Sequence, residues 1–360
     1  MIRAKRHDGR VCSDSRKIIG VWRISESICG REVFETHARA RRGGVSLIGA
    51  ASWTWSTLNS VARRFVQQWG TQASLGVPVV SVGNLQAGGA GKTPIAIEIA
   101  RELKARGKTV WILSRGYRSA LERSYGVLTE SSHTHPLSDY GDEAPLLAAH
   151  SRATVIVGAK RIENFKRYWA SGARCDLVIL DDGLQQFGLK KDFDVVCVTD
   201  ASPSDYFFRE RRTQWSEREW VIETKGSAPF QTPTERTSQV KLVSQIPESL
   251  RAKKLWLISG IGRPEHLLQS LTDQNVQMSK TTFLPDHHAY DGEEIKAFIR
   301  DARRQEFTLA ITEKDALKWK AFVNLADEGV EVIGYGCQWV SDRTLFFEAL
   351  WKSCFVSPCI

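Results

Sequence analysis

The sequence lacks the features of a protein that crosses a membrane or folds in an oxidising compartment. It has no unbroken apolar run of about eighteen residues, the length that a simple membrane-spanning helix needs. Its seven cysteines are scattered and include no Cys-x-x-Cys pair, which argues against a zinc site and a disulfide framework. The N-terminal residues have no apolar core or cleavage site of a secretory signal. We therefore expect a protein of a reducing compartment.

Negative charge is in short supply relative to positive charge. The chain carries 50 Lys and Arg against 41 Asp and Glu, a formal net charge of +9, which favours anionic partners such as nucleic acid, anionic lipid or a phosphorylated substrate. Residues 1–44 are rich in arginine and lysine and show no sustained apolar periodicity, so we interpret them as a disordered basic extension. The 360 residues that make up the chain are enough for two α/β lobes.

An amphipathic helix is predicted within residues 45–75. Apolar residues recur there at steps of three and four, with tryptophans and neighbouring arginines: Leu47, Ile48, Ala51, Trp55, Leu58, Ala62, Phe65, Val66 and Trp69. Helices that lie in a membrane surface have this composition. A helix that packs on an α/β core has it too, so this stretch alone leaves both interpretations open.

The strongest motif is a glycine-rich loop between a predicted strand and a predicted helix. The β-branched run Val79–Val82 enters it, and Gly91-Lys92-Thr93 leads into the helical pattern 95–104. Such a loop turns backbone N–H groups toward phosphate, and the helix start adds a positive dipole end. A strict phosphate-loop pattern would have glycine at position 86. We assign ATP binding to Gln86, Ala87, Gly88, Gly89, Ala90, Gly91, Lys92 and Thr93.

A second strong signal is the apolar run 177–180, which follows Asp176 and ends in Asp181-Asp182-Gly183. Mg²⁺ prefers oxygen ligands, and a carboxylate at the end of a neighbouring strand can act beside a phosphate-loop hydroxyl. We therefore predict a Mg²⁺ site at Thr93, Asp181 and Asp182. Gln185 follows on the same loop.

Two further polar sets lie where α/β proteins place ligand sites. Ser114-Arg115-Gly116-Tyr117 follows a predicted buried strand, 109–113. Asp142 and Glu143 open a short apolar helix, where carboxylates can serve merely to complement the helix dipole.

The order of these elements predicts a doubly wound α/β fold in two lobes. We expect a core at 76–225 like that of P-loop nucleoside triphosphatases. A linker rich in Thr, Ser, Pro and Gln should follow at 226–254, and a smaller α/β lobe at 255–360.

Taken together, these motifs resemble the tetraacyldisaccharide 4'-kinases, the lipid A 4'-kinases of Gram-negative bacteria. The resemblance covers about residues 45–320 and rests on an ordered series: Val82-Gly83-Asn84-Leu85, Gly88-Gly89-Ala90-Gly91-Lys92-Thr93-Pro94, Ser114-Arg115-Gly116-Tyr117, Gly141-Asp142-Glu143, Asp181-Asp182-Gly183-Leu184-Gln185, Gly260-Ile261-Gly262, Asp286-His287-His288 and Thr312-Glu313-Lys314-Asp315-Ala316. The family also has a residue other than glycine at position 86. The chain departs from the family at Arg211, where proline is usual, and at Gln186, where histidine is common.

The resemblance implies a reaction and roles for its residues. ATP would donate its γ-phosphoryl group, with Mg²⁺, to the 4'-hydroxyl of a tetraacyl glucosamine disaccharide 1-phosphate. The implied catalytic residues are Asp142 as base, His287 as its partner, Arg209 and Lys92. Arg115, Glu143 and Gln185 would contact substrate or phosphate.

An acylated substrate lies in a bilayer, so the resemblance also favours the membrane interpretation of the helix at 47–69. It implies a peripheral protein on the cytoplasmic face of the inner membrane, with no nucleic-acid partner. A rival from another class is a membrane-recruited switch ATPase, which hydrolyses ATP without phosphorylating a lipid. Such ATPases carry a signature lysine early in the loop, where this chain has Ala87.

Overall fold

The computed structural model describes residues 47–356 except 87–88, 203–206, 213, 252, 263 and 287. The predicted basic extension at 1–44 therefore lies outside the described residues, as do Ala87, Gly88 and His287. The described residues belong to one compact unit, Ala40–Ile360.

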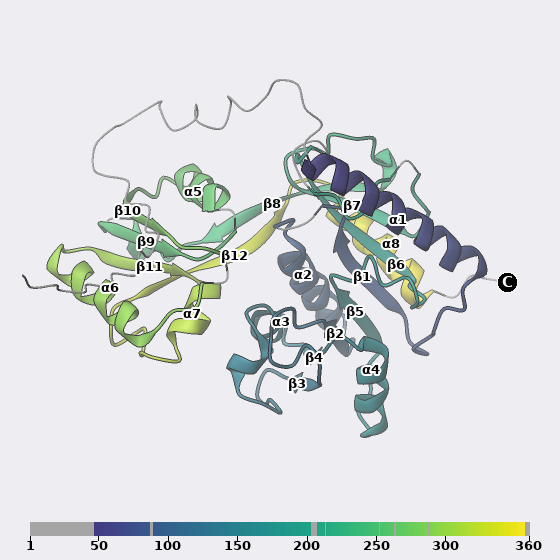
Figure 1. Ribbon diagram of the computed structural model, residues 1–360, viewed down its shortest axis with the longest axis horizontal. Helices are drawn as coiled ribbons and strands as arrows, with labels where there is room; N and C mark the ends of the chain where they lie inside the picture. Colours follow the sequence, from purple (N-terminus) through teal and green to yellow (C-terminus); the bar gives the residue numbers. More distant parts are fainter. Residues whose placement is uncertain are drawn as a thin grey trace, which may run out of the picture. The chain divides into compact units, whose positions relative to one another are not determined.

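Helices and strands alternate along most of the described chain (Figure 1). The α-helices are α1 (Leu47–Trp69), α2 (Lys92–Ala105), α3 (Ala144–Ser151), α4 (Arg161–Ala170), α5 (Pro264–Asp273), α6 (Gly292–Arg304), α7 (Glu313–Trp319) and α8 (Arg343–Phe355). The strands are β1 (Val79–Asn84), β2 (Val110–Ser114), β3 (Gly126–Leu128), β4 (Thr154–Val157), β5 (Leu177–Asp181), β6 (Phe193–Thr199), β7 (Glu219–Lys225), β8 (Thr237–Gln245), β9 (Leu255–Ser259), β10 (Met278–Phe283), β11 (Thr308–Thr312) and β12 (Glu331–Trp339).

Across the described residues, the strands form one 12-stranded sheet in the order β10-β9-β11-β12-β8-β7-β6-β1-β5-β2-β4-β3. Neighbouring strands run parallel except in the pairs β12–β8 and β3–β4. The parallel strands β1, β2 and β5 are mostly apolar and wholly buried, as expected where helices cover both faces of a sheet. The predicted doubly wound α/β fold is confirmed, and β1 lies between β5 and β6 at its centre.

Five buried apolar clusters support the sheet in the described part of the chain. The largest cluster surrounds α2, whose Ile95, Ile99 and Leu103 recur at four-residue steps and are buried. A smaller cluster around Trp256 and Trp319 packs α6 and α7 against β9 and β11. The cluster around Trp256 and Trp319 lies within 255–360, the range expected for the second lobe.

The segment 226–254, expected to be a linker, contains a regular strand. Figure 1 shows β8 and β12 as long strands that run from one lobe into the other. β8 pairs parallel with β7 and antiparallel with β12. Val240 and Leu242 are buried and alternate with the exposed Gln239 and Lys241, a pattern typical of a strand with one buried face. The high content of Thr, Ser, Pro and Gln in this segment indicated a linker, and the two-residue period of the strand was missed.

The C-terminal helix α8 differs from the expected assignment of 255–360 to the second lobe. Its Phe346 lies 5.9 Å from Phe193 and 5.7 Å from Trp220, measured between ring centroids. Both partners belong to the largest cluster, so the chain returns to the first lobe at its end.

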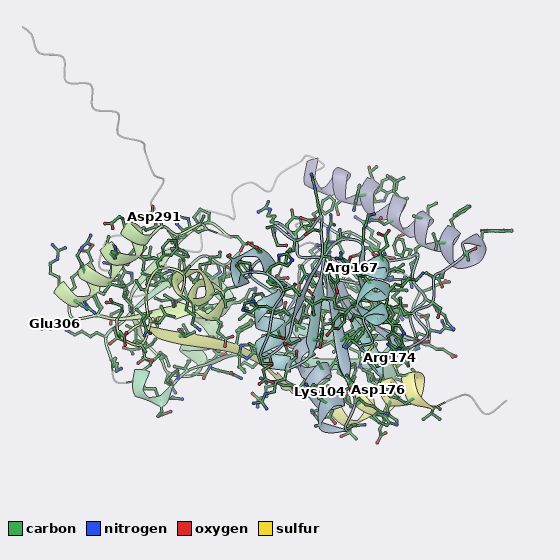
Figure 2. The ribbon with its side chains drawn as sticks, turned by 90° about the horizontal axis from the view of Figure 1, so that it is seen from below. Lys104, Arg167, Arg174, Asp176, Asp291 and Glu306 are labelled. Carbon is green, nitrogen blue, oxygen red and sulfur yellow. The ribbon has the colours of Figure 1, made fainter. Side chains whose placement is uncertain are left out.

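Helix α1 covers the predicted residues, but its polar side faces the protein. Ser52 and Ser56 are fully buried, whereas Phe65 is 65% exposed and Trp69 79% exposed. Figure 2 shows α1 along the surface, with side chains that project away from the protein body. The apolar stripe read from the sequence is therefore turned outward. Among the described residues, no helix combines the length and apolar content needed to cross a membrane.

Candidate functional site

The site lies where three neighbouring parallel strands end. β1 ends at Asn84, β2 at Ser114 and β5 at Asp181, and the pairing of β1 and β2 with β5 aligns these ends. A cavity of about 1150 Å³ opens there. Its lining includes ten of the residues predicted from the sequence: Gly89, Gly91, Lys92, Thr93, Arg115, Glu143, Asp181, Asp182, Gln185 and Arg209. Most of the predicted site is thus brought together.

The glycine-rich loop has the backbone of a phosphate cradle. Helix α2 begins at Lys92, directly after Gly91, whose φ is +70°. A Cβ on Gly91 would lie 2.6 Å from Leu242 Cδ1, a flexible side-chain end, so it is the backbone conformation that favours glycine here. The first-turn N–H groups of α2 therefore lie at the edge of the cavity, where an anion can accept from them.

Lys92 and Asp182 form the charged centre of the site. Lys92 Nζ lies 3.4 Å from Asp182 Oδ1 and donates to Asn84 Oδ1 at 3.2 Å. Arg209 donates to both carboxylate oxygens of Asp182, at 2.9 and 2.8 Å. Burial alone would raise the pKa of Asp182, but Lys92 and Arg209 outweigh it and hold the pKa below its ordinary value. Asp182 thus keeps both cations at the cavity.

Asp181 is a different carboxylate, although it is the adjacent residue. Its Oδ2 accepts from Ser114 Oγ at 3.0 Å, while its buried Oδ1 has no hydrogen-bond partner in the described part of the chain. Burial, with the nearby charges of Glu143 and Asp182, raises the pKa of Asp181 to about 7. A buried carboxylate oxygen without a donor fits the oxygen ligand that a divalent cation requires.

The other ligands of such a cation would have to come from a hydroxyl and from the nucleotide. In the described residues, no group of three or more His, Cys, Asp or Glu side chains could hold a metal ion. Thr93 lines the same cavity and supplies a hydroxyl. Asp182 is already bonded to Arg209, so Asp181 suits direct ligation better.

Sequence reasoning gave no role to Arg161, which the structure places beneath the site. Its guanidinium is buried and donates to the backbone oxygen of Asp181 at 2.8 Å. Burial lowers the pKa of Arg161, against the opposing effect of both aspartates. Arg161 begins α4 soon after the end of β4, so the rule that placed Ser114 at the site could also have found it.

Gln86 supports the loop from below. Its side chain is fully buried, and its Nε2 donates to Thr199 Oγ1 at 2.5 Å. Ala90 is also buried, and its carbonyl accepts from Thr224 Oγ1 at 3.1 Å. The Gln86 side chain therefore holds the loop to β6 and points away from the cavity.

Asp142 is paired with a residue that sequence reasoning did not single out. Lys318 Nζ, at the end of α7 in the second lobe, lies 3.1 Å from Asp142 Oδ2 and donates to the His288 carbonyl at 3.1 Å. Lys318 thus ties Asp142 to the Asp286–His288 segment. The expected partner His287 lies outside the described residues.

One further bridge between the lobes joins residues that had no predicted role, and Arg115 and Gln185 form contacts within the first lobe. His150 Nε2 in α3 lies 3.0 Å from Glu313 Oε1 in α7, and both residues line the cavity. Arg115 Nε pairs with Glu122 at 2.9 Å while it also borders the cavity. Gln185 donates to the Asn84 carbonyl at 3.3 Å.

Comparison with known proteins gives a consistent result. A family model described as tetraacyldisaccharide-1-P 4'-kinase matches residues 46–353. A tetraacyldisaccharide 4'-kinase from Anaeromyxobacter sp. (strain K) is 31% identical over 277 residues, which are 68% of this chain and 73% of that protein. The enzyme of the same name from Methylobacterium sp. (strain 4-46) is 34% identical over 268 residues, 69% of this chain and 78% of that protein.

A solved structure shares the fold. The crystal structure of LpxK from Aquifex aeolicus in complex with ATP has a TM-score of 0.67 to this chain at 20% identity, and the match covers 85% of this chain and 98% of that chain. The family model covers most of the sequence, and relatives above 30% identity extend over two thirds of it. The chain therefore belongs to the tetraacyldisaccharide-1-P 4'-kinase family.

Proposed function

We propose that the protein transfers the γ-phosphoryl group of ATP to the 4'-hydroxyl of a tetraacyl glucosamine disaccharide 1-phosphate. The observation that carries this proposal is the pairing of Lys92, at the start of α2, with Asp182 at the end of β5. This pair places a cation at the phosphate-binding loop and a carboxylate just after a neighbouring strand, as phosphoryl transfer requires. The chain that carries it belongs to the kinase family.

Phosphoryl transfer asks a protein mainly for positioning and charge compensation. Lys92 and the first N–H groups of α2 hold the phosphates. Arg209, kept at the cavity by Asp182, adds positive charge where negative charge develops. Asp181 and Thr93 would hold Mg²⁺, which would supply Lewis-acid charge compensation for the phosphates.

The acceptor hydroxyl needs a group that takes its proton. Asp142 is assigned that role, and Lys318 keeps its carboxylate oriented toward the Asp286–His288 segment. His287 would join it as partner. Glu143 and Arg115 border the cavity and are assigned to contacts with the substrate or its phosphate.

The lipid surface is assigned to the outward face of α1. Trp53, Trp55, Leu58, Val61, Phe65 and Trp69 are all more than half exposed. A helix that turns large apolar side chains outward along its length is suited to lie in a membrane interface. The protein would thus act peripherally, on the cytoplasmic face of the inner membrane.

The proposal is tested with purified protein, γ-labelled ATP and the disaccharide 1-phosphate in mixed micelles. We expect label in the lipid, mapped to the 4' position, with transfer that depends on Mg²⁺. ATP hydrolysis that proceeds without lipid labelling would reject the kinase and favour the switch ATPase.

A further inference from the structure

The inward face of α1 contacts the loop that carries Arg209. Ser52 Oγ accepts a hydrogen bond from the backbone N–H of Phe208 at 2.8 Å. Two turns further along the helix, Asn59 Nδ2 donates to the backbone carbonyl of Arg209 at 2.9 Å. The loop is therefore held at two consecutive residues by polar side chains of α1.

A buried charge cluster joins the same helix to the same loop. Arg63 of α1 donates to Glu210 at 3.3 Å and to Glu219 at 2.7 Å. Arg212 contacts the same two carboxylates, at 3.4 and 3.1 Å. Both glutamates are only 1% exposed, so neither water nor salt screens them well. Arg63 thus supplies one of the two cations that this cluster needs.

Glu210 shows how much the cluster depends on its cations. Burial raises the pKa of Glu210 to about 7, and Glu219 reinforces the shift, whereas Arg63 and Lys191 oppose it. Removal of Arg63 would leave two buried carboxylates facing Arg212. Their repulsion would then act on the residue next to Arg209.

The other side of the loop contacts the phosphate site. The Arg209 N–H donates to the Leu85 carbonyl at 2.6 Å, directly after β1. Its guanidinium binds Asp182 through both carboxylate oxygens. The loop therefore lies between α1 and the phosphate site. A displacement of α1 would be transmitted to Arg209 through the contacts of Asn59 and Arg63.

We propose that Asn59 and Arg63 are positioning residues for Arg209, so that α1 couples a lipid surface on its outer face to phosphoryl transfer at the site. This inference rests on the proposed kinase function. A surface that fixes the outer face of α1 also fixes its inner face, because both belong to one rigid helix. A displacement of about 1 Å at a charge-compensating group can cost up to about 100-fold in rate.

A double-mutant cycle in the full chain tests the coupling. It combines Arg63→Met with Arg209→Lys, which keeps the charge but removes the planar guanidinium. We expect Arg63→Met to lower kcat for lipid phosphorylation by about 10- to 100-fold, with little change in KM for ATP. The same substitution in the Arg209→Lys background should add almost nothing. Arg63→Lys should restore part of the rate.

The matched control is Arg64→Met, which removes the same charge from the exposed neighbour on α1. Its effect should be the same factor in both backgrounds, because it acts only through binding to anionic lipid. If Arg63→Met shows no cooperative thermal transition and is therefore unfolded, Asn59→Ala replaces it in the cycle. That variant leaves the charge cluster intact. Asn59→Ala should likewise lower kcat, and the same substitution in the Arg209→Lys background should add almost nothing.

Independent, multiplicative losses from Arg63→Met and Arg209→Lys, in an enzyme that phosphorylates the lipid, would overturn the coupling while the kinase assignment stands. A normal rate in a folded Arg63→Met variant would overturn it as well.

Discussion

Asp182 and Asp142 are each paired with a lysine, yet the two pairs are built differently. Asp182 and Lys92 lie 3.4 Å apart. Asp182 directly follows β5, and Lys92 begins α2, the helix that comes after the adjacent strand β1. Asp142 and Lys318 lie 3.1 Å apart, but Lys318 comes from α7 in the other lobe. The nucleotide side of the site is thus local to one lobe, and the acceptor side is assembled across two.

This difference separates the expected effects of substitution. Changes on the nucleotide side should weaken ATP binding and transfer together. Changes on the acceptor side should slow transfer and leave ATP binding intact, since the loop and α2 do not depend on α7.

The largest effect on the nucleotide side is expected from Lys92→Ala. Loss of the cation that contacts the phosphates should lower kcat/KM for ATP by roughly 1000-fold. The control is Lys104→Ala in the last turn of the same helix (Figure 2). A folded Lys92→Ala variant with near-normal transfer would remove the phosphate-loop assignment.

A smaller effect is expected from Lys318→Met. The variant loses the cation that orients Asp142, so kcat should fall about tenfold while the Kd for ATP stays unchanged. Lys320→Met, an exposed neighbour just beyond α7, is the control for charge. Weakened ATP binding in Lys318→Met would show that the two sides of the site are not separate.

A similar or smaller effect is expected at the lipid-facing side of α1. Phe65→Ser with Trp69→Ser removes two exposed apolar side chains, and should lower partitioning onto anionic vesicles by about tenfold or more. ATP binding should not change. Val340→Ser, which removes another exposed apolar side chain away from α1, is the control. Equal sedimentation of all three proteins with vesicles would contradict the lipid-facing assignment.

The smallest effect concerns pH and stability. The pKa of Glu210 is about 7 in the folded chain, above the ordinary 4.5. The folded state therefore binds more protons between these values, and stability falls as pH rises through about 7. Glu210→Gln should show a weaker decrease in Tm between about pH 5 and pH 8. Identical dependence of Tm on pH in the wild type and Glu210→Gln would mean that the pKa of Glu210 is not raised in the folded chain.

The sequence predicted the local side of the site better than the rest. Lys92 could be predicted from the glycine-rich loop between a strand and a helix, and Asp181 from its place at the end of a buried strand. The contact of Lys318 with Asp142 could not be predicted, because two charged residues far apart in sequence carry no periodic signal. The polar face of α1 was misleading for a related reason: Arg63 resembles a solvent-facing residue until its buried carboxylates are known.

The separation of the two sides is tested most directly by Asp142→Asn, with ATP binding and lipid phosphorylation measured on the same preparation. Loss of the base should lower kcat by about 100- to 10,000-fold, because the acceptor proton has no positioned carboxylate to receive it. The Kd for ATP should stay within about twofold of the wild-type value, since no group of the phosphate site is altered. Loss of ATP affinity in parallel with transfer, or transfer at the wild-type rate, would contradict this account.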